Sequence, residues 1–217
     1  SGRMNEYYIP TGAGESEYVE KRSQFLGHVR RVESEDEARA FIAEMKKKHY
    51  DARHNCWCYI IRGGAERYSD DGEPQGTAGI PMLEVFRREE VTNVVCVVTR
   101  YFGGVLLGAG GLLRAYTKSA KEALDAAGVS AVRRWVETEL DCSYAQAEKL
   151  KGEVTASGGA VSSVDYAAGV TVRALVPEEK LEAFSARIFD VSAGSVAVRA
   201  VGEAYRAVPV RQKEKFF

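Results

Sequence analysis

The chain has 217 residues, of which 45% are hydrophobic and 28% are charged. That balance is typical of a globular protein with a buried core and excludes an intrinsically disordered chain. Lys and Arg number 30 against 31 Asp and Glu, so the net charge of -1 provides no overall attraction for nucleic acid, and any RNA contact requires a local basic patch.

The four cysteines follow no repeated spacing, and three lie in strand-like apolar runs, so we expect reduced core thiols. No apolar stretch reaches the ~18 residues of a membrane-spanning helix, and no signal peptide is recognised. A cytoplasmic protein is therefore predicted. Ser1, Gly2 and Arg3 precede the first methionine and are interpreted as residues left by expression.

The beginning of the chain predicts two strands and a helix. Alternating residues around 18–20 and 25–29 favour antiparallel strands. Ser34, with Glu37 three residues later, forms a possible capping box ahead of a helix with one apolar face. The three lysines at 46–48 close that helix where cations favour its dipole.

The next segments alternate between strands, loops and helices. Residues 55–61 predict a strand, and residues 62–79, rich in Gly, Asp and Pro, predict a long loop of the kind that carries function. A short helix over 80–87 precedes residues 94–98, whose continuous β-branched run is typical of a strand covered on both faces. A helix over 112–127 follows a glycine-rich segment.

The pattern changes after residue 134, where we place the boundary between domains 1–134 and 135–217. The remaining elements predict the order β-α-β-β-α-β of ferredoxin-like domains. They are a strand over 136–142, a helix over 145–156, strands over 160–166 and 170–176, a helix after Pro177 and a strand over 195–205. The fold class predicted is α+β, with two domains that each have one layer of helices and one sheet.

The glycine-rich segment is the strongest local signal for a binding site. Its glycines free the backbone for positive φ and expose N–H groups at a positive helix terminus, where an anion is favoured. Arginines on both sides add charge, and two aromatic rings offer stacking. An alternative is a tight crossover in which the glycines only permit close packing. The candidate anion or RNA-binding residues are Arg100, Tyr101, Phe102, Gly103, Gly104, Gly108, Gly110, Gly111 and Arg114.

A second candidate segment carries three carboxylates beside a probable helix start. Such a cluster could bind Mg²⁺ or act as acid and base. The competing interpretation is a set of turns in which Thr77 or a carboxylate caps the helix. The candidate residues are Asp70, Asp71, Glu73 and Thr77.

Weaker signals come from histidines, cysteines and basic groups. His54, Cys56 and Cys58 share one face of a predicted strand, but ligands along one strand diverge and no second cluster completes a zinc site. We therefore expect buried thiols beside a hydrogen-bonded histidine, and no metal or cofactor. Basic groups at 46–48, 53, 87–88 and 133–134, with Tyr50, Tyr68, Tyr101 and Phe102, provide the mixture that RNA binding requires, or are solvated helix ends.

Two long motifs of this sequence resemble those of a known protein family. The segment from Arg100 to Tyr116, RYFGGVLLGAGGLLRAY, and the segment from Asp70 to Pro81, DDGEPQGTAGIP, resemble the paired signature of the Impact/YigZ family. Ser23 and His28 resemble the N-terminal motif of that family, and Arg53 to Cys56, with His54, its strand motif. The motif match covers about residues 15–128, whereas the second half fits the bacterial members in pattern only.

The resemblance implies a fold and a cellular context. It implies that the first domain is similar to domain four of elongation factor G and to a ribosomal small-subunit protein domain, and that the second is similar to the last domain of that factor. Eukaryotic members restrain a kinase response to amino-acid starvation, but this chain has a ferredoxin-like domain instead of their extra domain. The resemblance therefore implies a role in which the protein contacts RNA, the ribosome or a translation-associated protein, by analogy of fold.

We therefore expect a non-enzymatic, translation-linked binding protein of the cytoplasm. Its partners would be RNA, the ribosome or a translation-associated protein, without reading of a DNA sequence, and a monomer is favoured. The alternative is an enzyme that binds a small molecule or nucleotide phosphate with the glycine-rich segment and the acidic cluster. Nothing in the sequence supplies a recognisable base or nucleophile for it, so no catalytic residue is predicted.

Overall fold

The structure is a computed structural model that describes residues 6–211. The chain divides into two compact units. The first contains residues 7–131 with residues 207–211, and the second contains Glu6 with residues 132–206. The interpretation of Ser1, Gly2 and Arg3 concerns residues outside the described part. No helix within residues 6–211 has the length and apolar character that crossing a membrane requires.

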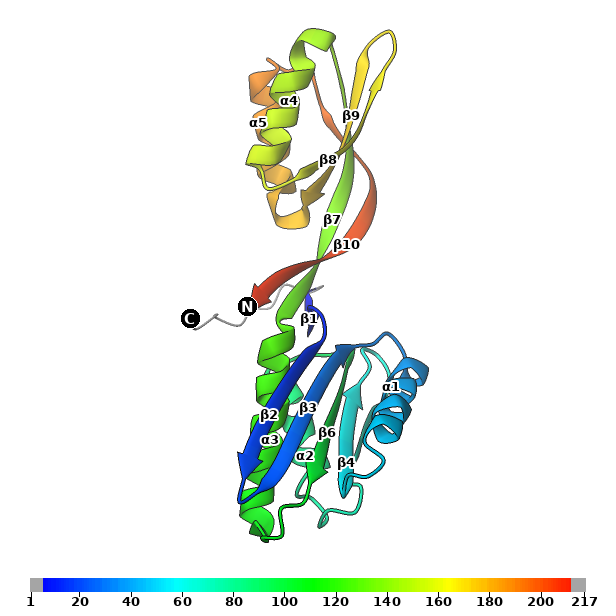
Figure 1. Cartoon of the computed structure of the whole chain (residues 1–217). Helices are drawn as coiled ribbons and strands as arrows, with labels where there is room; N and C mark the ends of the chain where they lie inside the picture. Colours follow the sequence, from blue (N-terminus) through cyan, green and yellow to red (C-terminus); the bar gives the residue numbers. More distant parts are fainter. Residues whose placement is uncertain (1–5, 212–217) are drawn as a thin grey trace. The chain divides into compact units, whose positions relative to one another are not determined.

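The first unit is built on a five-stranded antiparallel sheet with the strand order β2-β3-β6-β4-β5 (Figure 1). The long central strand β6 pairs with β3 on one side and with β4 on the other. The elements in chain order are β1 (Tyr7–Pro10), β2 (Gly14–Glu20), β3 (Ser23–Arg31), α1 (Glu35–Lys48), β4 (His54–Ile60), β5 (Glu66–Ser69), α2 (Gly79–Arg88), β6 (Val94–Tyr101) and α3 (Gly108–Ala127).

Helix α1 begins where the sequence predicts. The hydroxyl of Ser34 accepts a hydrogen bond from the backbone N–H of Glu37, which caps the helix. The Glu37 carboxylate binds the N–H of Glu33 and not that of Ser34, so only half of the predicted capping box is present. The apolar face of α1, which includes Phe41 and Met45, is buried.

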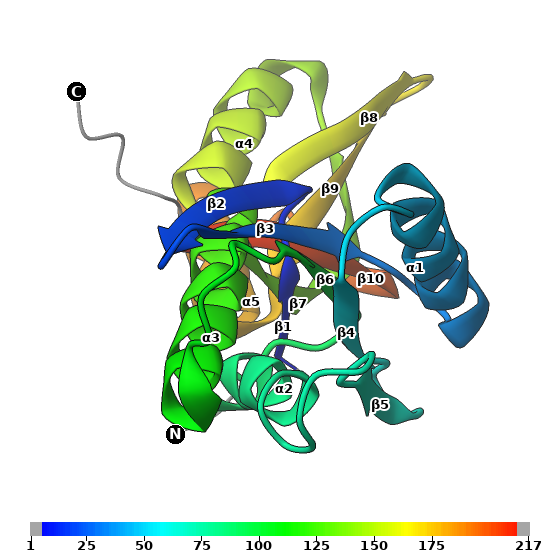
Figure 2. The same cartoon turned by 60° about the horizontal axis from the view of Figure 1, so that its bottom comes forward.

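Both faces of this sheet are covered by helices (Figure 2). Along β6, Val94, Cys96 and Val98 pack in a core with α2 and α3, while Val95 and Val97 pack against α1 on the opposite face. The α+β class is confirmed, but the prediction of two layers is wrong for this unit. The uninterrupted β-branched run of β6 results from this double coverage, because neither face of the strand meets water.

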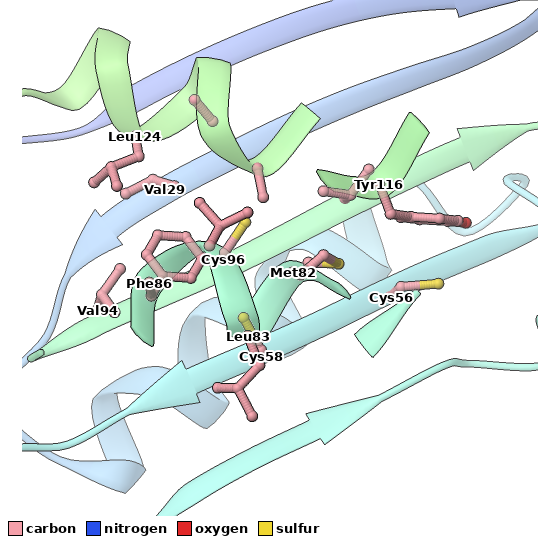
Figure 3. Packing of buried hydrophobic residues seen from close by; sticks show 14 of the residues in the cluster. Val29, Cys56, Cys58, Met82, Leu83, Phe86, Val94, Cys96, Tyr116 and Leu124 are labelled. Atoms are coloured by element: carbon pink, nitrogen blue, oxygen red, sulfur yellow. The ribbon is translucent and has the colours of Figure 1, made fainter. Parts of the chain in front are cut away.

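The larger core lies between the sheet and helices α2 and α3 (Figure 3). It contains the thiols of Cys56, Cys58 and Cys96, which are free and buried, while Cys142 is free and half-buried. Burial raises the pKa of the three buried thiols, so they are protonated at neutral pH. Core thiols in this state behave as small apolar side chains and not as metal ligands.

Helix α3 lies directly on the backbone of two strands. A β-carbon on Gly14 would come within 2.1 Å of the Ala123 carbonyl oxygen, and one on Gly27 within 2.7 Å of the Ser119 carbonyl oxygen. The hydroxyl of Ser16 donates to the same Ser119 carbonyl at 2.7 Å. The helix therefore packs at a distance that only glycine allows on these strands.

Three features of the first unit differ from the sequence prediction. The loop predicted over 62–79 contains the short edge strand β5, whose exposed polar residues give little alternation. Strand β1 was not predicted. Helix α3 begins at Gly108 and not near residue 112, so Gly110 and Gly111 lie within its first turn despite their low helix propensity.

The second unit has the predicted element order. Strand β7, whose residues 129–131 belong to the first unit, pairs with β1, β9 and β10, and β9 pairs with β8, so the strands of the second unit lie in the order β10-β7-β9-β8. Its own core lies between this sheet and two helices. The elements are β7 (Val129–Cys142), α4 (Tyr144–Ala156), β8 (Ala160–Tyr166), β9 (Val170–Pro177), the 3₁₀-helix η1 (Glu178–Lys180), α5 (Leu181–Val191) and β10 (Val198–Arg211).

The division between the units falls inside strands. Contacts place the first boundary between Ala131 and Val132, within β7, and group residues 207–211 of β10 with the first unit. The predicted boundary after residue 134 also lies in β7, whereas the predicted second domain, 135–217, includes those residues of β10 and others outside the described range. Whether each unit folds alone stays a prediction.

We expect a fragment of residues 132–217 to fold by itself, because its buried residues, among them Leu140, Leu150, Val172 and Ile188, form a core of their own. Thermal unfolding followed by circular dichroism should give one cooperative transition. A fragment that melts without cooperativity would show that this unit depends on the first one.

Candidate functional site

A buried ion pair lies at the end of the central strand. Arg100, near the end of β6, is only 4% exposed, and its guanidinium NH1 lies 2.7 Å from the Glu73 carboxylate Oε1. Arg100 lies on the same face of β6 as Val94 and Val98, so it faces the core of α2 and α3, where residues 70–78, here called the acidic loop, fold over it. Its charge is neutralised inside the protein, which leaves little surface for the ligand contact that the sequence predicts.

Three further side chains complete the cluster around this ion pair. The Tyr116 hydroxyl, from α3, donates to Glu73 Oε1 at 2.9 Å, and the Ser23 hydroxyl, at the start of β3, accepts from Arg100 at 3.2 Å. The Nε2 atom of His54 lies 3.5 Å from Glu73 Oε1. We call these five residues the polar cluster: Ser23, His54, Glu73, Arg100 and Tyr116. It connects β3, β4, β6, α3 and the acidic loop at one end of the first unit.

The other carboxylates of the acidic loop bind backbone N–H groups. Asp70 accepts from Gly76, Ala78 and Gly79 at 2.8 to 3.2 Å, and so caps the start of α2 from within the loop. Asp71 accepts from the N–H of Asn55 at 2.7 Å. The interpretation of this segment as turns with a capping carboxylate therefore fits the geometry.

Three more groups that could act chemically are also engaged. The Thr77 hydroxyl donates to the Pro74 carbonyl at 2.5 Å and does not cap the helix. Burial raises the pKa of the Tyr116 hydroxyl far above its usual range, so this group stays protonated. The Nδ1 atom of His54 lies 2.8 Å from the Asp71 carbonyl oxygen, to which it donates. The five side chains of the polar cluster are thus held in place by contacts within the protein.

The outer surface of the same end is formed by residues 102–107, here called the glycine loop. Gly103 lies against the β2–β3 turn, since a β-carbon there would come within 2.1 Å of the Arg22 backbone. The guanidinium of Arg53 lies 5.0 Å from the centre of the Phe102 ring, and the backbone N–H of Arg53 donates to the Arg100 carbonyl. The loop thus has the turn on one side and the start of β4 on the other.

Unpaired cations gather around the glycine loop. They come from the β2–β3 turn, the end of α1, the start of β4 and the start of α3, and none has a carboxylate within ion-pair distance among residues 6–211. We call them the basic end: Lys21, Arg22, Lys46, Lys47, Lys48, Arg53 and Arg114. The end of α1 belongs to it because His49 contacts Tyr101, the last residue of β6, at 2.8 Å.

The sequence-predicted basic groups do not all belong to this surface. Arg87 is paired with Glu66 and Glu84, whereas Arg133 and Arg134 lie in the second unit with carboxylate partners of their own. Lys21 and Arg22 were missed as candidates. The signal that would have found them is the register of β3 on β6, which places the β2–β3 turn beside the glycine loop.

A cavity of about 350 Å³ lies next to the basic end, between β2, β3 and the end of α1. It is lined by His28 and His49, and burial lowers the pKa of both imidazoles. Tyr101 donates its hydroxyl proton to Asp51, so the Nδ1–H of His49 donates to Tyr101. His28 lies opposite Glu15 on β2. The sequence named His28 and Tyr101 but could not place them beside His49.

The predicted residues therefore separate into two groups. Ser23, His54, Glu73 and Arg100 are brought together inside the protein, with Asp70, Asp71 and Thr77 in the loop that covers them. Phe102, Gly104, Gly108, Gly110 and Arg114 are exposed on the outside. Gly103 is half-buried against the turn and Gly111 is half-buried in α3.

Both halves of the chain match known protein families. Residues 21–124 match the Impact N-terminal domain family, and residues 140–195 match a domain of unknown function, DUF1949. IMPACT family member YvyE of Bacillus subtilis (strain 168) is 38% identical over 200 residues, which cover 90% of this chain and 91% of that protein. The chain belongs to the IMPACT family.

Other relatives of this IMPACT family member cover different shares of the chain. IMPACT family member YigZ of Escherichia coli (strain K12) is 33% identical over 204 residues, 92% of this chain and 100% of that protein. Protein IMPACT homolog of Dictyostelium discoideum is 36% identical over 106 residues, 46% of this chain and 30% of that protein. A crystal structure of a hypothetical protein, 32% identical, matches 92% of this chain and 98% of its own with a TM-score of 0.58. The resemblance predicted from the motifs is confirmed.

The buried ion pair of this IMPACT family member predicts a large loss of stability when one partner is removed. Arg100→Ala or Glu73→Ala should lower the free energy of unfolding by about 3–5 kcal/mol, because the remaining charge stays buried without its partner. Urea unfolding measures this loss. Arg114→Ala, at an exposed position, is the matched control and should change stability by less than about 0.5 kcal/mol. Equal effects at both arginines would contradict the assignment.

The two histidines predict a stability that falls on acidification. Their pKa values are lowered in the folded protein, so below about pH 6.5 the unfolded chain binds more protons than the folded one. The two histidines therefore do not lower the free energy of unfolding above about pH 6.5, and they lower it increasingly as the pH falls below that value. A His28→Gln, His49→Gln double variant should lose less stability between pH 7.5 and pH 5 than the unmodified protein. Parallel unfolding curves for the two proteins across this range would contradict the prediction.

Proposed function

We propose that this IMPACT family member is a non-enzymatic, translation-linked binding protein that contacts RNA, in the ribosome or free, through the basic end of its first unit. The single observation that carries the proposal is the gathering of unpaired cations around the glycine loop in a chain whose net charge is -1. Such a local excess of positive charge attracts a phosphate backbone, which the chain as a whole does not.

The distribution of carboxylates supports the same proposal. Acidic side chains are as numerous as basic ones in the chain, but the three of the acidic loop are engaged within the protein, while Asp51 and Glu20, beside the basic end, bind the hydroxyls of Tyr101 and Tyr18. Glu73 is buried against Arg100, while Asp70 and Asp71 bind backbone N–H groups. A phosphate that approaches the glycine loop therefore meets cations from four elements without the repulsion that three exposed carboxylates would cause.

The inward orientation of these groups also weighs against an enzyme. A general base or a metal site requires carboxylates with free oxygen atoms directed at a substrate. Both oxygens of Asp70 and one oxygen each of Asp71 and Glu73 accept hydrogen bonds from within the protein, and the hydroxyl of Tyr116 is held protonated. The polar cluster instead stabilises the loops that present the basic end.

The fold is consistent with a role in translation. The second unit has the strand order β10-β7-β9-β8 with the connections β-α-β-β-α-β, which is the ferredoxin-like arrangement. We propose that it corresponds to the last domain of elongation factor G, and that the first unit corresponds to domain four of that factor. This correspondence is an analogy of fold and adds a cellular context, the cytoplasmic translation machinery, to the binding proposal.

The proposal predicts RNA binding that depends on salt and on the basic end. Replacing Arg22, Arg53 and Arg114 together by glutamine should weaken binding to RNA or to ribosomes. It should also flatten the plot of log affinity against log salt concentration by about 0.7 for each phosphate that the protein no longer neutralises. Co-sedimentation with ribosomes and fluorescence anisotropy with labelled RNA, each over a salt series, measure both effects.

The matched control replaces three exposed cations elsewhere, Arg88, Lys149 and Lys180, by glutamine. This variant has the same net charge as the test variant and should bind almost as the unmodified chain does. Equal weakening by both variants would indicate a dependence on net charge alone and would contradict a site at the basic end. A melting temperature raised by a nucleotide, with no binding to RNA or ribosomes, would favour the small-molecule alternative.

A further inference from the structure

The basic end also carries exposed apolar side chains. We call them the tip: Tyr50, Phe102, Val105, Leu106 and Leu113. Leu106, in the glycine loop, is 81% exposed, Val105 and Phe102 of the same loop are exposed, and so is Leu113 in the first turns of α3. Tyr50, which follows the lysines at the end of α1, is 82% exposed. Single exposed apolar residues are common, but several on one loop that is surrounded by cations indicate a contact surface.

Two glycines with positive φ flank the apolar residues of the glycine loop and leave open space beside them. Gly104 has φ of +88° and no atom of the protein within 4 Å of the position of a β-carbon, and the same is true of Gly108 with φ of +75°. Gly104 and Gly108 therefore place no side chain on either side of the segment Val105–Leu107. The side chains of Val105 and Leu106 are exposed, whereas Leu107 packs against the core.

The cations and rings of the tip are arranged together. Arg53 lies over the Phe102 ring, with its guanidinium 5.0 Å from the ring centre, and Arg100 lies 5.4 Å from the same centre on the buried side. Phe102 keeps 37% of its surface exposed. The exposed guanidinium of Arg53 and the exposed part of the Phe102 ring together form a surface that a planar base can contact.

We infer that the basic end recognises RNA through unpaired bases and prefers single strands over an intact duplex. This inference rests on the proposed function, to which it adds the class of RNA. In a duplex the faces of the bases are stacked on each other, so an apolar tip meets only a charged backbone, whose phosphates would lose hydration without a compensating hydrogen bond. In a single strand the base faces are accessible, and Phe102 and Leu106 can contact them while the cations bind the phosphates.

The first test compares two RNA ligands on the unmodified, full-length chain. Fluorescence anisotropy is measured with a labelled RNA of about 12 nucleotides that cannot pair with itself and with an RNA duplex of about 12 base pairs, at the same salt concentration. The single strand should bind about 10-fold more tightly or better, since stacking of even one or two bases has this magnitude. Equal affinities, or tighter binding of the duplex, overturn the inference and leave the proposed function in place.

The second test uses a variant of the apolar tip. Phe102→Leu with Leu106→Ser should weaken binding of the single strand about 10-fold and leave the salt slope unchanged, because every phosphate contact is retained. The matched control is Phe189→Leu with Val201→Ser, at two exposed apolar positions of the second unit. Thermal melts of both variants check that they fold. Unchanged binding by the folded tip variant overturns the inference.

The two proposals fail in different ways. If neither RNA binds at low salt, the proposed function and this inference both fail. If both RNAs bind and respond to the cation variant but not to the tip variant, only the inference fails. Capture of an acidic protein by the tip, with no RNA binding, would identify the surface as a protein interface and would overturn both.

Discussion

The buried pair of Arg100 and Glu73 is the interaction on which the candidate site depends. It joins a central strand to the acidic loop, and Tyr116 and Ser23 extend the contact to α3 and to β3. Taking two charges out of water is costly, and the pair is maintained because Glu73 also accepts from Tyr116 and Arg100 also binds Ser23. The same contacts hold the two loops of the family motifs in place.

The pair also holds the charges of the acidic loop within the protein. The carboxylates of this loop are satisfied by an arginine or by backbone N–H groups, and cations that lack partners among residues 6–211 lie at the surface beside it. A chain with almost equal numbers of acidic and basic residues thereby presents one strongly basic surface. The electrostatic field at a surface depends on this arrangement and not on the sum of the charges.

Local sequence patterns predicted most elements of the fold. The cap at Ser34, the continuous apolar run of β6 and the β-α-β-β-α-β order of the second half all rest on neighbouring residues. The short edge strand β5 could not be predicted in this way, because its polar residues face solvent and its pairing with β4 is set by tertiary contacts.

The candidate site shows the same limit more sharply. The motifs identified Arg100, Glu73 and the glycines, but nothing local distinguishes an arginine that meets a ligand from one that is buried against a carboxylate. That distinction depends on how the acidic loop folds over β6. Lys21 and Arg22 belong to the basic end only through the register of three strands, which is not encoded by neighbouring residues.

The contact of α3 with Gly14 and Gly27 has a consequence for affinity. The backbone of the helix contacts the backbone of the strands at both positions. No side chains lie between them that could repack if the helix shifted on the sheet. These contacts, at Ser119, Ala123 and Ala127, fix the position of the helix that carries Arg114. A ligand that binds at the start of this helix orders the Arg114 side chain but need not order the helix itself, so less of the binding free energy is lost to conformational entropy than on a mobile arm.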